Sequence, residues 1–234
     1  MNSTLQPETT RLPRRPRHGE LLLALVSLMF VQSCLSPENQ IHRVALNALF
    51  FLVVLSAIRS LTGSAARMWG TLLAGVSAYA ASWANEITGT AWLAIVSDSC
   101  FALVFVFLIY AVGENVFGEG PIDANRIIGA VSIYFLLGLL WAFLYTLAAL
   151  VQPGAFLFPV ENAESTENTR LLSEFIYFSN VTLTTLGYGD VVPLSRPAKM
   201  LAVLQAMLGQ LYLAVVVARM VGLQVSQKST EESA

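Results

Sequence analysis

Six long runs of apolar residues, separated by short polar segments, constrain the fold more than any other feature of this sequence. A helix needs about 20 apolar residues to cross the hydrocarbon core of a bilayer, and each run approaches or exceeds that length. The sequence therefore predicts an all-α membrane protein with six transmembrane helices. The predicted spans are Glu20–Leu35, Arg43–Arg59, Arg67–Ala84, Ala91–Gly113, Ile127–Val151 and Ala198–Gly222.

The composition supports this fold class and argues against several functions. Of the 234 residues, 56% are hydrophobic and 12% are charged, and the mean hydropathy is +0.65, whereas a soluble domain has about 25% charged residues. The net charge is −2 and the basic residues are dispersed, so no nucleic-acid partner is expected. No group of residues resembles a hydrolytic triad or a nucleotide-binding loop, so we do not expect an enzyme.

Basic residues in the short loops predict the orientation, because Lys and Arg accumulate on the cytoplasmic side. With the N-terminus in the cytoplasm, nine of the 13 basic residues fall on the inner side and four on the outer side. We therefore expect a multi-pass protein of the plasma (inner) membrane with both termini in the cytoplasm. The expected segments are cytoplasmic tails at 1–19 and 223–234, a four-helix module at 20–113, a cytoplasmic linker at 114–126 and a two-helix module at 127–222.

The last module carries a polar, glycine-bearing segment between its two spans. The apolar patch Phe175–Leu183 is too short to cross a bilayer and fits a re-entrant half-helix, with Ser173 as a candidate N-cap. The sequence Thr-Leu-Thr-Thr-Leu-Gly-Tyr-Gly-Asp then occupies Thr182–Asp190. Gly187 and Gly189 permit backbone dihedrals that a side chain opposes, so consecutive carbonyls can point the same way. Four copies of the segment around an axis could supply rings of oxygens to a dehydrated cation.

The core of this segment, Thr185-Leu186-Gly187-Tyr188-Gly189, resembles the selectivity filter of potassium channels. Together with the flanking spans, residues 127–222 resemble the two-helix pore module of the potassium-channel superfamily, especially short bacterial members of the "ion channel 2" group. The resemblance implies a potassium-selective channel that conducts K⁺ passively and assembles with three identical subunits into a homotetramer. It implies no cofactor besides the permeant K⁺, which would bind to the backbone carbonyls of Thr185, Leu186, Gly187 and Tyr188.

The resemblance also implies supporting roles around the filter. Many family members have aromatic residues that form a cuff behind the filter, and Tyr177 and Phe178 occupy these positions. A hydrogen bond from Tyr177 to Asp190 is therefore expected. Asp190 would brace the outer end of the filter and present negative charge to arriving cations. Thr182 and Thr184 complete the expected set of supporting residues.

Two positions inside the spans have more than one interpretation. Gly209 lies twenty residues after Gly189, where the family has a glycine that lets the inner helix bend, but a glycine there also permits close helix–helix contact. The neighbouring Gln210 could form a hydrogen bond across that interface. Asp98, an acid inside the fourth span, could pair with Arg43, act as a proton or ligand sensor, or stay neutral and unpaired.

The four-helix module lacks the pattern of a voltage sensor. The fourth predicted span, Ala91–Gly113, contains no arginine, and steep voltage dependence requires charges that move through the membrane field. Steep voltage gating is therefore not expected. The alternative functions are a poorly selective monovalent cation channel and, in a different class, a non-conducting receptor or scaffold with a vestigial pore loop.

Overall fold

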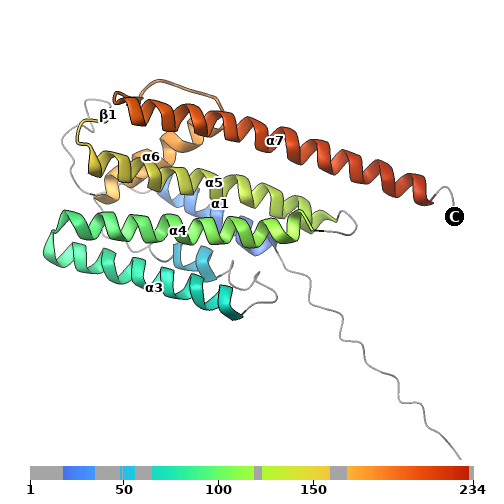
Figure 1. Cartoon of the computed structure of the whole chain (residues 1–234), viewed down its shortest axis with the longest axis horizontal. Coiled ribbons are helices and arrows are strands. Elements are labelled where there is room, and N and C mark those ends of the chain that lie inside the picture. The colour runs from blue at the N-terminus through green and yellow to red at the C-terminus, as the bar shows by residue number, and fades with distance from the viewer. Residues whose placement is uncertain are drawn as a thin grey trace, which may run out of the picture.

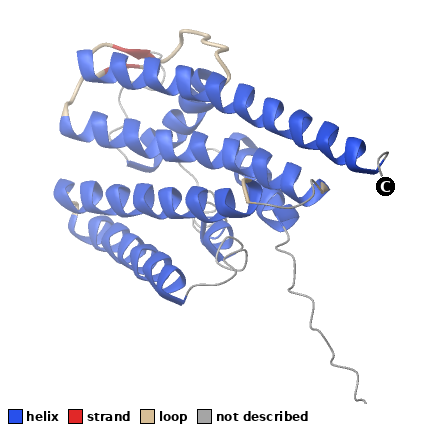
Figure 2. Ribbon diagram, turned by 45° about the vertical axis from the view of Figure 1, so that its right-hand side comes forward, coloured by secondary structure: helices blue, strands red, loops and turns tan. Residues whose placement is uncertain are grey.

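The computed structural model describes residues 18–34, 48, 50–55, 65–118, 123–158 and 168–231, which are helical along most of their length (Figure 2). The predicted helical character is therefore confirmed. The helices are His18–Cys34 (α1), Ala65–Thr88 (α3), Ala91–Val116 (α4), Ala124–Val151 (α5), Asn168–Leu183 (α6) and Arg196–Glu231 (α7). Two short strands, Phe156–Leu157 (β1) and Val192–Pro193 (β2), form an antiparallel pair.

Helix α5 lies at the centre of the arrangement. It packs against α1, α4, α6 and α7, whereas α3 packs against α4. Figure 1 shows α3, α4, α5 and α7 as successive layers, with α1 and α6 beside α5. Because α6 contacts both α5 and α7, this short helix is held between the two long helices of the last module.

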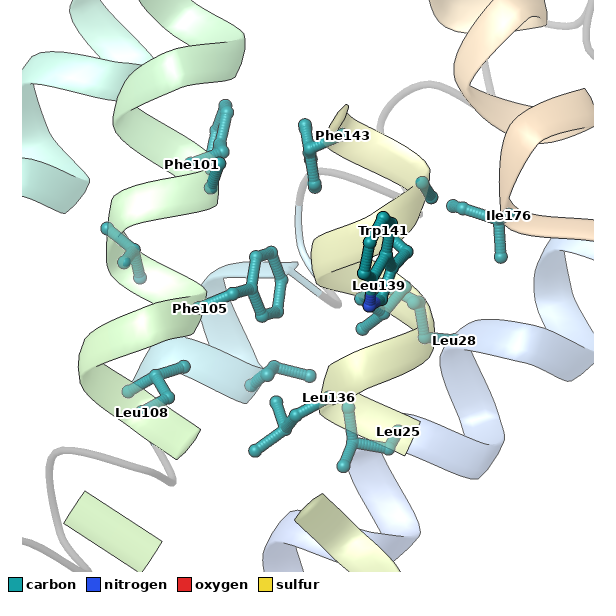
Figure 3. Close-up of a cluster of buried hydrophobic side chains, with 14 of the residues drawn as sticks. Leu25, Leu28, Phe101, Phe105, Leu108, Leu136, Leu139, Trp141, Phe143 and Ile176 are labelled. Atoms are coloured by element: carbon teal, nitrogen blue, oxygen red, sulfur yellow. The ribbon is translucent and has the colours of Figure 1, made fainter. Parts of the chain in front are cut away.

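The apolar core lies where α4, α5 and α1 meet (Figure 3). Phe143 of α5 stacks on Phe101 and Phe105 of α4, with ring centroids 5.4 Å and 5.6 Å apart. Phe50 meets Phe143 edge-on at 5.9 Å. Buried leucines extend this cluster toward α1: Leu25, Leu28, Leu136 and Leu139. In a bilayer such packing holds helices together mainly through van der Waals contact, because lipid tails are as apolar as leucine.

Polar side chains fix the starts of α5 and α7. The carboxylate of Asp123 accepts a hydrogen bond from the backbone N–H of Arg126 at 3.0 Å, and Ser195 Oγ accepts one from the backbone N–H of Ala198 at 3.2 Å. Both are side-chain caps of backbone donors in the first turn of a helix. The helices therefore begin two to three residues before the predicted spans, at Ala124 rather than Ile127 and at Arg196 rather than Ala198.

Three helical stretches of the described residues are long and apolar enough to cross a membrane, namely Trp92–Val116, Ala124–Val151 and Arg196–Gly222. They correspond to the fourth, fifth and sixth predicted spans. Helix α1 contributes a shorter apolar stretch, His18–Val31. Helix α3 covers the third predicted span but is not among the three. The second predicted span, Arg43–Arg59, lies largely outside the described residues.

Helix α6 begins earlier than the sequence predicted. It starts at Asn168, so Ser173 lies inside the helix and is not its N-cap. Leu171 and Leu172 pack against the core, and they extend the apolar side of the helix toward its N-terminus.

Helix α7 ends later than the sequence predicted. It continues to Glu231, so much of the expected tail at 223–234 is helical. Gly222 does not end the helix, because a single glycine in a helix costs only about 1 kcal/mol relative to alanine, and no proline follows it.

Candidate functional site

The glycine-bearing segment turns back against the end of α6. The backbone N–H of Leu186 donates to the carbonyl of Val181 at 2.9 Å, and the N–H of Gly187 donates to the same oxygen at 3.4 Å. The N–H of Thr185 donates to the carbonyl of Thr182 at 3.0 Å. The carbonyls at a helix C-terminus lack partners within the helix, and here the first residues of the loop supply them. These bonds fix where the segment leaves the helix.

The backbone of this segment alternates in the sign of φ. Thr185, Gly187 and Gly189 have φ values of 60°, 58° and 80°, whereas φ is not positive at Leu186 or Tyr188. Such an alternation can turn successive N–H groups toward one side of the chain and the carbonyl oxygens toward the other, and the N–H groups of Leu186 and Gly187 do point to one oxygen, that of Val181. Both glycines singled out from the sequence therefore occupy left-handed positions.

Thr185 is the strained residue of the segment. A β-branched residue with positive φ is an outlier, and such a conformation costs about 1–3 kcal/mol. The hydrogen bonds from Thr185 to Thr182 and from Leu186 to Val181 hold it in place. Strain of this kind persists where the surroundings determine the geometry, and it clusters at functional sites.

Asp190 ends the segment and accepts two hydrogen bonds. The hydroxyl of Tyr177 donates to Asp190 Oδ2 at 2.6 Å, and the backbone N–H of Val191 donates to Oδ1 at 2.9 Å. The hydrogen bond from Tyr177 lowers the pKa of the Asp190 carboxyl, because it stabilises the ionised form. Asp190 therefore carries a negative charge at neutral pH.

Phe178 has a different environment from Tyr177. Tyr177 is 39% exposed, whereas Phe178 is buried, and the ring of Phe178 packs against Tyr145 and Phe156 at centroid distances of 4.9 Å and 5.9 Å. Phe156 belongs to β1, which pairs with β2 just after Asp190. The strand pair and the aromatic cluster therefore tie the end of the segment to the turn that follows α5.

Gly209 of α7 lies in close contact with the end of α6. A Cβ atom on Gly209 would lie 2.4 Å from the carbonyl oxygen of Leu183 and 3.0 Å from its Cδ1. The same carbonyl accepts a hydrogen bond from the hydroxyl of Tyr134 in α5 at 3.0 Å. Close helix–helix contact therefore describes Gly209 in this structure, and bending of α7 at this glycine stays a prediction.

A buried chain of hydrogen bonds joins α5, α6 and α7. Gln205 Nε2 donates to the carbonyl oxygen and the hydroxyl of Ser179 at 3.0 Å and 2.7 Å. Gln205 Oε1 accepts from the hydroxyl of Tyr145 at 2.6 Å, and Ser179 Oγ donates to the carbonyl of Gly138 at 2.6 Å. Gln210, the amide predicted to bond across the helix interface, is exposed on the single chain. Gln205 carried the same signal, an amide within an apolar span.

The other predicted site residues have separate surroundings. Thr184 follows α6 directly and its hydroxyl donates to the carbonyl of Asn180 at 2.7 Å, while Thr182 lies half-buried in the last turn. Asp98 lies on α4, which packs mainly against α3 and α5. Asp98 Oδ2 is buried and has no hydrogen-bond partner among the described residues, and Arg43 lies outside them.

The glycine-bearing segment lies within a region that matches a known protein family. Residues 99–224, more than half of the chain, match the ion channel family. The chain belongs to this family. The matched region contains α5, α6 and the glycine-bearing segment, and it is a pore module of the potassium-channel superfamily. Family membership and the three long apolar helices make the channel a membrane protein.

Two curated relatives resemble parts of the channel. It is 34% identical to Two pore potassium channel b of Oryza sativa subsp. japonica over 90 residues, which are 38% of this chain and 22% of the relative. It is 35% identical to Protein LctB of Bacillus caldotenax over 71 residues, which are 30% of this chain and 52% of the relative. The channel thus covers at most about half the length of these relatives. No solved structure matches the chain.

Proposed function

We propose that four copies of this chain form a homotetrameric channel that conducts K⁺ passively and selectively. Each subunit contributes one filter segment, Thr185–Gly189, whose carbonyl oxygens replace the hydration shell of K⁺. The observation that carries the proposal is the alternating sign of φ along this segment, because this backbone arrangement orients consecutive carbonyls alike. K⁺ is the permeant ion, and no other cofactor is invoked.

A single subunit is incomplete by this account. Residues 184–190 are exposed on the single chain, and only 11% of the apolar stretch Arg196–Gly222 is buried. A long apolar helix exposed to this extent needs lipid or other protein around it. Four-fold assembly would gather the filter segments around one axis and would bring the four α7 helices around the pore.

The charges at both ends of the filter favour cations. Helix α6 ends at Leu183, next to the filter, and a helix C-terminus carries a partial charge of about −0.5. At the other end of the filter, the ionised Asp190 adds a full negative charge. Both features attract cations and repel anions.

We assign each subunit six membrane spans and a re-entrant helix, α6, that enters the membrane from outside. The membrane is the plasma (inner) membrane, and both termini lie in the cytoplasm. Helix α6 has 16 residues and is about 24 Å long at 1.5 Å per residue, which is shorter than the roughly 30 Å hydrocarbon core. The excess of basic residues on the assigned inner side supports this orientation. Without arginines in α4, steep voltage gating is not part of the proposal.

A poorly selective cation channel is the second candidate, because one filter residue, Leu186, is where many channels have valine. The Leu186 carbonyl is still available to an ion, and the matched plant protein is named a potassium channel, so we favour potassium selectivity. A scaffold with a vestigial pore loop is disfavoured by the strained φ of Thr185, because backbone strain of this kind clusters at functional sites.

The proposal is tested by reconstituting the purified full-length chain in liposomes loaded with either K⁺ or Na⁺ and measuring the efflux of each ion. We expect K⁺ efflux far above Na⁺ efflux, and we expect chemical crosslinking of the same sample to give a four-subunit species. Equal efflux of both ions would favour the poorly selective channel. A tetramer that releases neither ion would favour the scaffold.

Tyr177→Phe is expected to shorten the conducting periods of the channel without changing the ion it selects, because it removes only the hydroxyl that braces Asp190. The brace requires an ionised carboxylate, whose pKa the bond lowers. Its contribution is therefore complete above the ordinary aspartate pKa of about 4 and is lost as pH falls through the lowered value. The open durations of the wild type should therefore exceed those of the variant at neutral external pH, and this difference should disappear as the pH falls through the lowered value.

Single-channel recording at several external pH values measures this difference. Tyr110→Phe is the matched control, because Tyr110 is an exposed tyrosine on α4, outside the filter region. Equal open durations of Tyr177→Phe and the wild type at every pH would show that the bond to Asp190 does not brace the filter.

A further inference from the structure

Gln205 is an unusual residue for its position on α7. The helix is largely exposed on the single chain, whereas the polar side chain of Gln205 is fully buried. Burial of an amide without hydrogen-bond partners costs free energy, but both polar atoms of this amide are paired. Its Nε2 serves two acceptors on Ser179, and its Oε1 accepts from Tyr145.

The chemistry of the partners fixes the direction of every hydrogen bond in this chain. The carbonyl of Ser179 can only accept, so the NH₂ group of Gln205 must face Ser179 and its oxygen must face Tyr145. The Tyr145 hydroxyl therefore donates. Ser179 Oγ accepts a hydrogen bond from Gln205, and its hydroxyl donates a hydrogen bond to the carbonyl of Gly138. We call Tyr145, Gln205, Ser179 and Gly138 the interhelical relay.

The interhelical relay lies one helical turn from the contact between Gly209 and Leu183. Gln205 and Gly209 are four residues apart on α7, and their partners Ser179 and Leu183 are four residues apart on α6. Residues at this spacing share one face of a helix. Two adjacent turns of α7 are therefore fixed against the last two turns of α6.

The end of α6 leads directly into the filter. The carbonyl of Val181, between the two fixed positions, accepts hydrogen bonds from Leu186 and Gly187. A shift of α7 along or away from α6 would therefore displace Ser179. Because the filter begins within two helical turns of Ser179, the displacement would also move the filter backbone.

We propose that Gln205 is a positioning residue through which α7 holds the filter in its conducting geometry. This inference rests on the proposed function, because it assumes that the segment Thr185–Gly189 conducts. Gln205 binds no ion itself. It acts through Ser179, so the loss of its amide should change how long the filter conducts and leave the ion preference intact.

Gln205→Leu, Gln205→Glu and Tyr145→Phe are the test variants, each studied as the full-length chain by single-channel recording. Gln205→Leu leaves two acceptors on Ser179 without their donor, and it should lower the ratio of open to closed time at least about fivefold, the change expected for one buried hydrogen bond. Single-channel conductance should stay near the wild-type value.

Gln205→Glu should make open probability depend on pH, a result that is not expected if Gln205 serves only to pack the helices. A neutral carboxyl can donate to Ser179 but an ionised one cannot, and burial raises the pKa of a carboxyl. Open probability relative to the wild type should therefore be higher at about pH 5 than at about pH 8. Tyr145 is the titratable partner in the interhelical relay, and it stays protonated over this range because phenols titrate near pH 10.

Tyr145→Phe breaks only the first hydrogen bond of the interhelical relay. Combined with Gln205→Leu, it should lower open probability no further than Gln205→Leu alone, because residues of one network are not additive. The controls are Ser132→Ala and Thr146→Val. Ser132 and Thr146 are buried, and their hydroxyls donate to carbonyls of their own helix, at 2.8 Å and 3.0 Å.

Unchanged open probability in Gln205→Leu, or a Gln205→Glu channel without the pH dependence, would overturn the inference. If Gln205→Leu does not assemble, Tyr145→Phe decides in its place: a lowered open probability supports the inference and an unchanged one overturns it. Failure of the proposed function is recognised separately, because the wild-type chain would then show neither K⁺ flux nor greater thermal stability in K⁺ than in Na⁺.

Discussion

Alanine in place of Gly187 or Gly189 is expected to abolish selective K⁺ conduction. The two residues have φ values of 58° and 80°, and a residue with a Cβ pays about 1–2 kcal/mol to adopt the left-handed conformation. In a tetramer each substitution acts four times, for a total of about 4–8 kcal/mol. Nothing lies within 4 Å of the added Cβ in a single chain, so the expected loss comes from the backbone conformation.

Gly154→Ala is the matched control for this experiment. Gly154 also has a φ of 80° and open space around its Cβ position, but it lies in the turn after α5. We expect Gly154→Ala to lower the melting temperature of the protein and to keep selective current. Bilayer recordings of the three variants in K⁺ and Na⁺ make the comparison. Selective current in Gly189→Ala would contradict the assignment of this segment as the filter.

Gly209→Ala is expected to destabilise the packing between α7 and the end of α6. The new methyl group would lie 2.4 Å from the backbone carbonyl of Leu183, which cannot rotate away as a side chain could. Overpacking costs about 1–3 kcal/mol, while alanine improves helix propensity by about 1 kcal/mol. The net effect on each subunit should therefore be destabilising. Open probability should fall as well, because the contact adjoins the filter.

Gly222→Ala separates the cost of the clash from the gain in helix propensity. Gly222 lies on the same helix with nothing within 4 Å of its Cβ position, so this substitution gains propensity without a clash. Thermal unfolding of both variants in detergent should give a lower melting temperature for Gly209→Ala and an equal or higher one for Gly222→Ala. A Gly209→Ala tetramer that is as stable as Gly222→Ala but opens less often would instead support the hinge interpretation.

The sequence predicted α4 and α5 well, because each is a long uninterrupted run of apolar residues. Helices α4 and α5 lie within three residues of the predicted spans. The largest differences are at the start of α6 and at the end of α7. Leu171 and Leu172 carry α6 back to Asn168, and α7 passes Gly222 because a single glycine is a weak helix breaker.

The candidate site was predictable only in part. The glycines at 187 and 189 indicated the left-handed positions. The positive φ of Thr185 could not be predicted, because β-branched residues rarely adopt it. The interhelical relay depends on how α5, α6 and α7 are rotated against one another, which no single helix sequence specifies. Polarity marked both Gln205 and Gln210, and packing alone shows which of them is buried.

The reversal potential with K⁺ on one side of a planar bilayer and Na⁺ on the other tests potassium selectivity most directly. Purified full-length chain should give a current whose reversal potential moves toward the K⁺ equilibrium potential by about 59 mV for each tenfold preference, and reversing the two solutions should reverse its sign. A tetrameric channel whose current reverses near zero in both arrangements would contradict the selective filter.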